Sequence, residues 1–187
     1  RMDRLPSLPA ALLSAIHAAA PGETAVVAEG ERVHLALVTA AGWADWLATQ
    51  EEAVRQWLAA TGFVAKRHRL GLWRGAQDDS ADAVFIVDGR GEAGGAAALA
   101  AALPATGRVW QVVDPAGHVA ALELHYGWAL AGYRFDRYRA GPGERTARLL
   151  TGDPAAARRA SHLARAVFLA RDLINTPAND LGPVELE

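Results

Sequence analysis

The sequence has 187 residues, no cysteine, a formal net charge of −2 and an apolar fraction of 51%. A chain of this length buries roughly 70% of the surface that its unfolded form exposes, enough for one domain with its own core. Without cysteine, the chain has no disulfide scaffold, no cysteine-based zinc or iron–sulfur site and no thiol nucleophile. The near balance of 19 basic and 21 acidic residues argues against a dedicated nucleic-acid binder.

The start of the chain and its apolar runs give no sign of a membrane or of export. The first residues, Arg1 to Arg4, do not open a signal peptide, and no apolar run reaches the roughly 18 residues that span a bilayer. We therefore expect a soluble, cytoplasmic protein with no membrane partner. Arg1 is interpreted as an added residue, with the native start at Met2.

Short β-rich runs alternate with alanine-rich stretches of helical spacing along the whole chain. This alternation predicts βαβ units, and hence a three-layer α/β fold: a mainly parallel or mixed sheet with helices on both faces. Trp43, Trp46 and Trp57 fall near helical spacing and are expected to pack against that sheet. In chain order the predicted elements are a helix at Leu8–Ala20, strands at Thr24–Ala28 and Val33–Thr39, a helix at Glu51–Thr61, strands at Arg69–Arg74 and Ala83–Asp88, a helix at Gly95–Leu103, a strand at Val109–Asp114, a helix at His118–Tyr133, a strand at Thr146–Thr151 and a helix at Pro154–Leu173.

The last predicted helix has the clearest boundaries. Asp153 is its expected N-cap, with Pro154 at the first helical position, where a missing N–H costs nothing. The helix is expected to end at Leu173, before Asn175-Thr176-Pro177, because Pro177 disfavours the α region for the residue before it. We therefore place a domain at residues 1–173 and a junction segment at residues 174–187. The predicted buried stripe of the helix is Ala160, Leu163, Ala164, Val167 and Phe168.

One glycine-rich motif, G-x-G-x-x-G at residues 89–94, follows a predicted strand and precedes a predicted helix. This order is typical of a dinucleotide site, in which an acid such as Asp114 would bind the ribose hydroxyl. Asp88 and Glu92, however, place carboxylates where phosphates would lie. A plain glycine-rich turn is the preferred interpretation, and a module that binds ADP-ribose or a dinucleotide through the Gly89–Gly95 turn is the alternative. The residues of that alternative site are Gly89, Gly91, Gly94 and Asp114.

No residue set predicts a metal or catalytic site in this chain. His118 and His125 lie seven residues apart, about 10.5 Å along a helix, too far for one zinc ion. The acidic cluster Asp78, Asp79 and Asp82 lacks the pattern of a calcium loop and predicts a solvated hairpin or loop. The four remaining histidines are isolated in sequence, and no serine stands in a nucleophile elbow.

Two stretches near the end of the chain are similar to a known family. Gly127–Arg139 reads GWALAGYRFDRYR, and Ala170–Pro183 reads ARDLINTPANDLGP. Both resemble segments of the leucyl (cytosolic) aminopeptidases: the first near the close of their N-terminal domain, the second at the junction with their catalytic domain. The resemblance assigns Asn175, Pro177 and Asn179 to the junction motif, with a role in chain geometry rather than in catalysis.

The resemblance implies a parent metalloexopeptidase with two divalent metal ions, Zn or Mn, which releases N-terminal residues from peptides. It also implies a macro-type N-terminal domain, a hexameric assembly and contact with the enzyme's own catalytic domain. The family's metal-ligand segments, NTDAEGR and GxxFDTGG, are not in this sequence. We therefore expect no catalytic and no metal-binding residues in this chain, and no activity from it alone. Contact with DNA in an assembled parent is a further possibility, to which the near-neutral charge gives little support.

Overall fold

A computed structural model describes residues 26–27, 32–74, 81–88, 93–104, 109–138, 147–180 and 182. Its strands are β1 (Val26–Val27), β2 (Arg32–Thr39), β3 (Leu70–Arg74), β4 (Ala81–Val87), β5 (Val109–Val113) and β6 (Arg148–Leu150). Its helices are α2 (Trp43–Ala48), α3 (Glu52–Ala60), α4 (Ala93–Ala102), α5 (Ala121–Ala131) and α6 (Pro154–Asn175). The helix predicted at Leu8–Ala20 lies outside the described residues.

The strands form one six-stranded sheet in the order β1-β6-β5-β2-β4-β3. Every neighbouring pair is parallel except β3 and β4, which pair antiparallel. In the centre of the sheet, Leu35 of β2 lies between Ala83 of β4 and Val112 of β5. The prediction of a mainly parallel or mixed sheet is thus confirmed. The antiparallel β3–β4 pair also fits the predicted hairpin, in which Asp82 lies in β4 while Asp78 and Asp79 fall outside the described residues.

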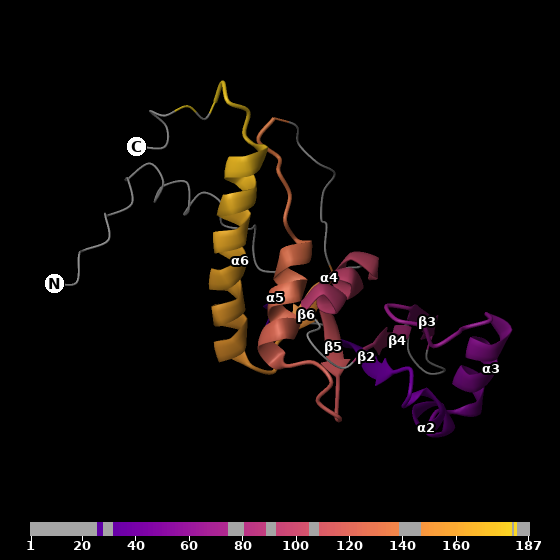
Figure 1. Cartoon of the computed structure of the whole chain (residues 1–187). Helices are drawn as coiled ribbons and strands as arrows, with labels where there is room; N and C mark the ends of the chain where they lie inside the picture. Colours follow the sequence, from indigo (N-terminus) through magenta and orange to yellow (C-terminus); the bar gives the residue numbers. More distant parts are fainter. Residues whose placement is uncertain are drawn as a thin grey trace.

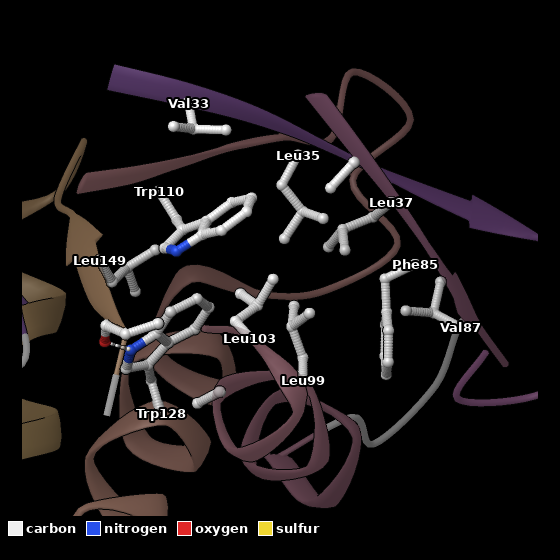
Figure 2. Packing of buried hydrophobic residues seen from close by; sticks show 13 residues of the cluster. Val33, Leu35, Leu37, Phe85, Val87, Leu99, Leu103, Trp110, Trp128 and Leu149 are labelled. Carbon is white, nitrogen blue, oxygen red and sulfur yellow. Dashed lines mark hydrogen bonds between the residues drawn. The ribbon is translucent and has the colours of Figure 1, made fainter. Parts of the chain in front are cut away.

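The larger core lies between one face of the sheet and helices α4 and α5. Strand side chains such as Leu35 and Phe85 pack there against Leu99 of α4 and Trp128 of α5 (Figure 2). Trp128 and Trp110 are both fully buried in this core. The Trp128 indole N–H donates to the backbone oxygen of Ala147, 2.7 Å away.

The opposite face of the sheet is covered by α2 and α3, which lie at the far end of the molecule from α6 (Figure 1). Val84 and Ile86 of β4 pack there with Leu58 of α3. The Trp43 and Trp46 rings stack with centroids 5.2 Å apart, and Trp46 and Trp57 each lie within 6.3 Å of Trp73 on β3. The tryptophans therefore pack against the sheet, as predicted. The short helix α2 was not among the predicted elements.

Helix α6 packs beside α5 (Figure 1). Asp153 caps it: one carboxylate oxygen accepts the backbone N–H groups of Ala155 and Ala156, at 3.0 and 2.9 Å. Pro154 occupies its first turn, so the cap is as predicted, but the helix runs to Asn175, two residues beyond the predicted end at Leu173. No helix among the described residues has the length and apolarity needed to cross a bilayer.

The predicted buried stripe of α6 is partly wrong. Ala160, Ala164 and Phe168 are buried as expected, but Leu163 is 44% exposed and Val167 is only half-buried. The helix is rotated so that Ala160, Ala164 and Phe168 lie inward, and the two small alanine side chains there let α6 approach the domain closely. Hydrophobicity alone favours the larger Leu163 for the inward face.

Candidate functional site

Tyr133 lies just beyond the C-terminal end of α5 and links it to the C-terminal end of α6. Its hydroxyl donates to the Asp172 carboxylate at 2.9 Å and accepts from the Asn175 side-chain amide at 3.0 Å. Its ring packs against Phe168 with ring centroids 5.1 Å apart. The guanidinium carbon of Arg171 lies 5.1 Å from the centre of the Tyr133 ring. Four side chains on one face of α6 thus contact Tyr133.

Burial raises the pKa of the Tyr133 phenol above its ordinary value. The amide of Asn175 works in the opposite direction, because it donates to the phenol oxygen, whereas the Asp172 carboxylate raises this pKa further. Tyr133 therefore stays protonated at neutral pH and keeps its proton available for Asp172.

The chain turns sharply where α6 ends. Thr176 adopts an extended conformation with φ −78° and ψ 124°, as the residue before a proline should. Its backbone N–H and its hydroxyl both donate to the Asp172 backbone oxygen, at 2.9 and 2.7 Å. The N–H of Asp180 then donates to the oxygen of Pro177 at 2.9 Å and closes a turn. Residues 176–180 are therefore an ordered connector.

A second tyrosine also binds this connector. The Tyr138 hydroxyl donates to the Asp180 carboxylate, and this hydrogen bond raises the pKa of Tyr138. The Phe135 ring lies 5.7 Å from the Tyr138 ring, and the Arg137 guanidinium carbon lies 5.7 Å from its centre. We call Tyr133, Tyr138, Asp172, Asn175 and Asp180 the junction cluster. It joins residues 39 to 42 positions apart in the sequence.

The junction cluster brings together the two stretches on which the resemblance rests. Of the three residues that the resemblance assigns to the junction, Asn175 contacts Tyr133, Pro177 opens the turn, and Asn179 lies exposed within it. Sequence reasoning gave no role to the two tyrosines or to the two aspartates. Their only signal is that they lie inside those two stretches.

The alternative nucleotide site is poorly supported by the residues that the structure describes. Both oxygens of Asp114 are engaged by its own turn, accepting from the backbone N–H groups of His118 and Val119 at 3.0 and 2.9 Å. Gly94 has no atom within 4 Å of the position of a Cβ, whereas the third glycine of a dinucleotide motif allows close packing. Gly89 and Gly91 lie outside the described residues.

The described histidines differ in their surroundings: His125 is buried, whereas His34 and His162 are exposed. His125 is buried in α5; one ring nitrogen contacts the backbone oxygen of Ala121, and the other lies 3.0 Å from the Thr151 hydroxyl. His118 lies just before α5, not within it as predicted. Among the described residues, no group of three or more His, Asp or Glu side chains could hold a metal ion.

The covered sheet and the junction cluster define a three-layer α/β domain whose last helix ends in an ordered connector. The family model described as M17 aminopeptidase, N-terminal domain, matches residues 33–151. The chain therefore belongs to this family, the N-terminal domains of the M17 aminopeptidases.

Relatives of known sequence agree with this assignment. A probable cytosol aminopeptidase of Chelativorans is 40% identical over 107 residues, which cover 49% of this chain and 21% of the relative. One from Rhizobium meliloti is 29% identical over 159 residues, which cover 66% of this chain and 32% of the relative. The matched part of the chain thus spans a third or less of the length of these relatives.

Solved structures share the fold. The cytosol aminopeptidase of Coxiella burnetii has a TM-score of 0.72 at 24% identity, over 86% of this chain and 35% of that protein. The bottromycin maturation enzyme BotP in complex with Mn has a TM-score of 0.57 at 22% identity, over 84% of this chain and 34% of that protein. The prediction of an α/β domain of the leucyl aminopeptidases is therefore confirmed.

Proposed function

We propose that this domain is non-catalytic and that its role is to position a catalytic domain that follows it in the same polypeptide. The observation that carries this proposal is the junction cluster. Tyr133 and Tyr138 fix both the last turn of α6 and the connector that leaves it, so the chain departs in one defined direction. Asn175, Pro177 and Asn179 then serve chain geometry, with the domain boundary at residues 173–174.

The whole protein would be a metalloexopeptidase that releases N-terminal amino acids from peptides. The names of the relatives support the reaction, and the complex of BotP with Mn supports a divalent metal, Zn or Mn, for the family. A pair of such ions polarises the scissile carbonyl and lowers the pKa of a bound water. The described residues of this domain do not fit such a centre, because no group of three His, Asp or Glu side chains converges. We therefore place the metals outside this domain.

Three further properties belong to the same proposal. The relatives are named cytosol aminopeptidases, which supports a cytoplasmic location. We propose that the full-length protein is a hexamer and that this domain supports its assembly. We also propose that the domain limits which peptides reach the catalytic site. No observation favours a nucleic-acid or ADP-ribose ligand over this role.

The test compares residues 1–187 with the protein made from the complete reading frame. Each is supplied with Mn²⁺ or Zn²⁺ and assayed on leucine p-nitroanilide, and mass spectrometry verifies each sample. We expect metal-dependent hydrolysis by the longer protein and a rate indistinguishable from buffer for residues 1–187. Metal-dependent turnover by residues 1–187 would show that this domain is catalytic. An inactive longer protein would overturn the aminopeptidase assignment.

A further inference from the structure

The outward side of α6 carries an apolar stripe. Leu163 is 44% exposed and Ile174 is 82% exposed, although both are large apolar side chains. Ala166 and Ala170 are also exposed. At 100° per residue these four exposed positions fall within about 80° of one another, on the face of the helix next to the one buried by Ala160, Ala164 and Phe168. We call Leu163, Ala166, Ala170 and Ile174 the α6 stripe.

The helix that carries this stripe is cationic, in contrast with the chain as a whole. α6 contains four arginines and one aspartate, so its formal charge is 4 − 1 = +3 with histidine neutral. The whole chain has a net charge of −2. Arg158, Arg159 and His162 are exposed around the first half of the α6 stripe. A complementary surface would be an apolar groove bordered by carboxylates.

The α6 stripe ends where the chain leaves the domain. Ile174 precedes Asn175, whose side chain belongs to the junction cluster, and the ordered connector begins two residues later. Since the chain matches only 35% of the length of the Coxiella burnetii enzyme, such a protein has a large second part. A second part tethered through a short ordered connector experiences a high effective concentration at the end of α6.

We propose that the α6 stripe docks against the catalytic domain of the same polypeptide, through an apolar groove bordered by carboxylates. This inference rests on the proposed function, because it requires that such a domain follows. A second copy of this domain is a less suitable occupant: a symmetric contact would place two helices of charge +3 against each other.

Hydrogen–deuterium exchange tests the docking by comparing residues 1–187 with the full-length protein. We expect peptides covering residues 160–175 to exchange at least tenfold more slowly in the full-length protein, while peptides covering α3 exchange equally. Leu163→Glu and Ile174→Glu should each remove this difference. The matched control is Val64→Glu, because Val64 is 54% exposed and lies beyond α3, far from the α6 stripe. Equal exchange of residues 160–175 in the two unsubstituted proteins would overturn the docking.

Two measurements separate the docking from its rivals. In the first, a cross-linker is attached at Ile174→Cys in a mixture of unlabelled and ¹⁵N-labelled full-length subunits. We expect cross-linked products within one chain only. Products that join a labelled to an unlabelled chain would assign the stripe to a second copy and overturn the proposal. Full-length protein that hydrolyses leucine p-nitroanilide but shows no slower exchange in α6 overturns the docking alone. Full-length protein without that activity overturns the proposed function, and the exchange data then show whether any following domain covers the stripe.

Discussion

Gly127 of α5 lies against the backbone of Ala93 in α4. A Cβ atom on Gly127 would stand 2.0 Å from the carbonyl oxygen of Ala93 and 2.8 Å from the Cβ of Ala96. Both distances are far below van der Waals contact, and the first involves backbone, which cannot rotate away. The two helices that cover the larger core therefore meet at a point where only glycine fits.

We predict that Gly127→Ala destabilises the domain by about 2 kcal/mol or more, because overpacking outweighs the roughly 1 kcal/mol gained in helix propensity. The matched control is Gly94→Ala, where the Cβ position has no atom within 4 Å. There the gain in helix propensity remains, up to about 1 kcal/mol. Urea unfolding measures both variants. Equal stability changes for the two would refute the close helix contact.

The two buried tryptophans of the larger core differ in hydrogen bonding. Trp128 donates to the Ala147 oxygen at 2.7 Å, whereas the Trp110 indole N–H finds no acceptor among the described residues. Replacement by phenylalanine removes similar volume at both sites, but only Trp128→Phe loses a hydrogen bond. We therefore expect Trp128→Phe to cost about 1–2 kcal/mol more than Trp110→Phe. Chemical denaturation measures the loss in unfolding free energy for each variant. A larger loss for Trp110→Phe than for Trp128→Phe would contradict the prediction.

Thr151 couples His125 of α5 to the start of α6. Its hydroxyl lies 3.0 Å from the His125 ring nitrogen and also accepts the Asp153 N–H at 3.2 Å. Thr151→Val keeps the shape but removes the hydroxyl, which leaves a buried ring nitrogen unpaired. We expect a loss of about 1–2 kcal/mol in unfolding free energy, and a smaller one for Thr151→Ser. A Thr151→Val variant as stable as the parent would contradict this coupling.

The junction cluster gives the domain a specific response to alkaline pH. Burial holds the pKa of Tyr133 above its unfolded value, so the folded state retains a proton that the unfolded state loses. The stabilisation is fully present below about pH 10 and is lost as the pH rises through the folded pKa. We therefore expect Tyr133→Phe to flatten the decline of stability at alkaline pH.

The titration of Tyr133 can be followed directly by its absorbance at high pH. Asn175→Ala should raise the pKa of Tyr133 further, because the amide that favours the phenolate is removed. Asp172→Asn should lower it, because the neighbouring negative charge is gone. If both variants shift the pKa in the same direction, the hydrogen-bond arrangement around Tyr133 is not the one described.

Alternation of strand-forming and alanine-rich segments was sufficient to predict the six strands and the order of α3, α4, α5 and α6. Asp153 and Pro154 predicted the start of α6, and Pro177 indicated its end to within two residues, because capping and proline chemistry are local. The buried face of α6 was harder to predict, because alanine occurs all around the helix. Its orientation follows from close packing against α5, which a sequence pattern does not specify. Helix α2 has six residues and no side-chain N-cap, so it left no boundary signal.

The site illustrates the same difference between local and long-range information. The two stretches that resemble the aminopeptidases could be found separately, and the connector after Pro177 followed from its proline. The hydrogen bonds of Tyr133 and Tyr138 could not be predicted, because each joins residues about 40 positions apart that come together only through the packing of the helices. The glycine-rich motif shows the same limit, because its spacing carries no information about where the Asp114 carboxylate points.

Helix α6 is held at both ends, by Asp153 and Thr151 at its start and by Tyr133 at its finish. Its 22 residues make a rod about 33 Å long at 1.5 Å per residue. A rod of that length acts as a lever: a tilt of about 5° at Thr151 would move the far end by about 3 Å. Small changes in packing beside β6 would therefore be amplified at the connector, so His125 and Thr151 help to set the direction in which the connector leaves α6.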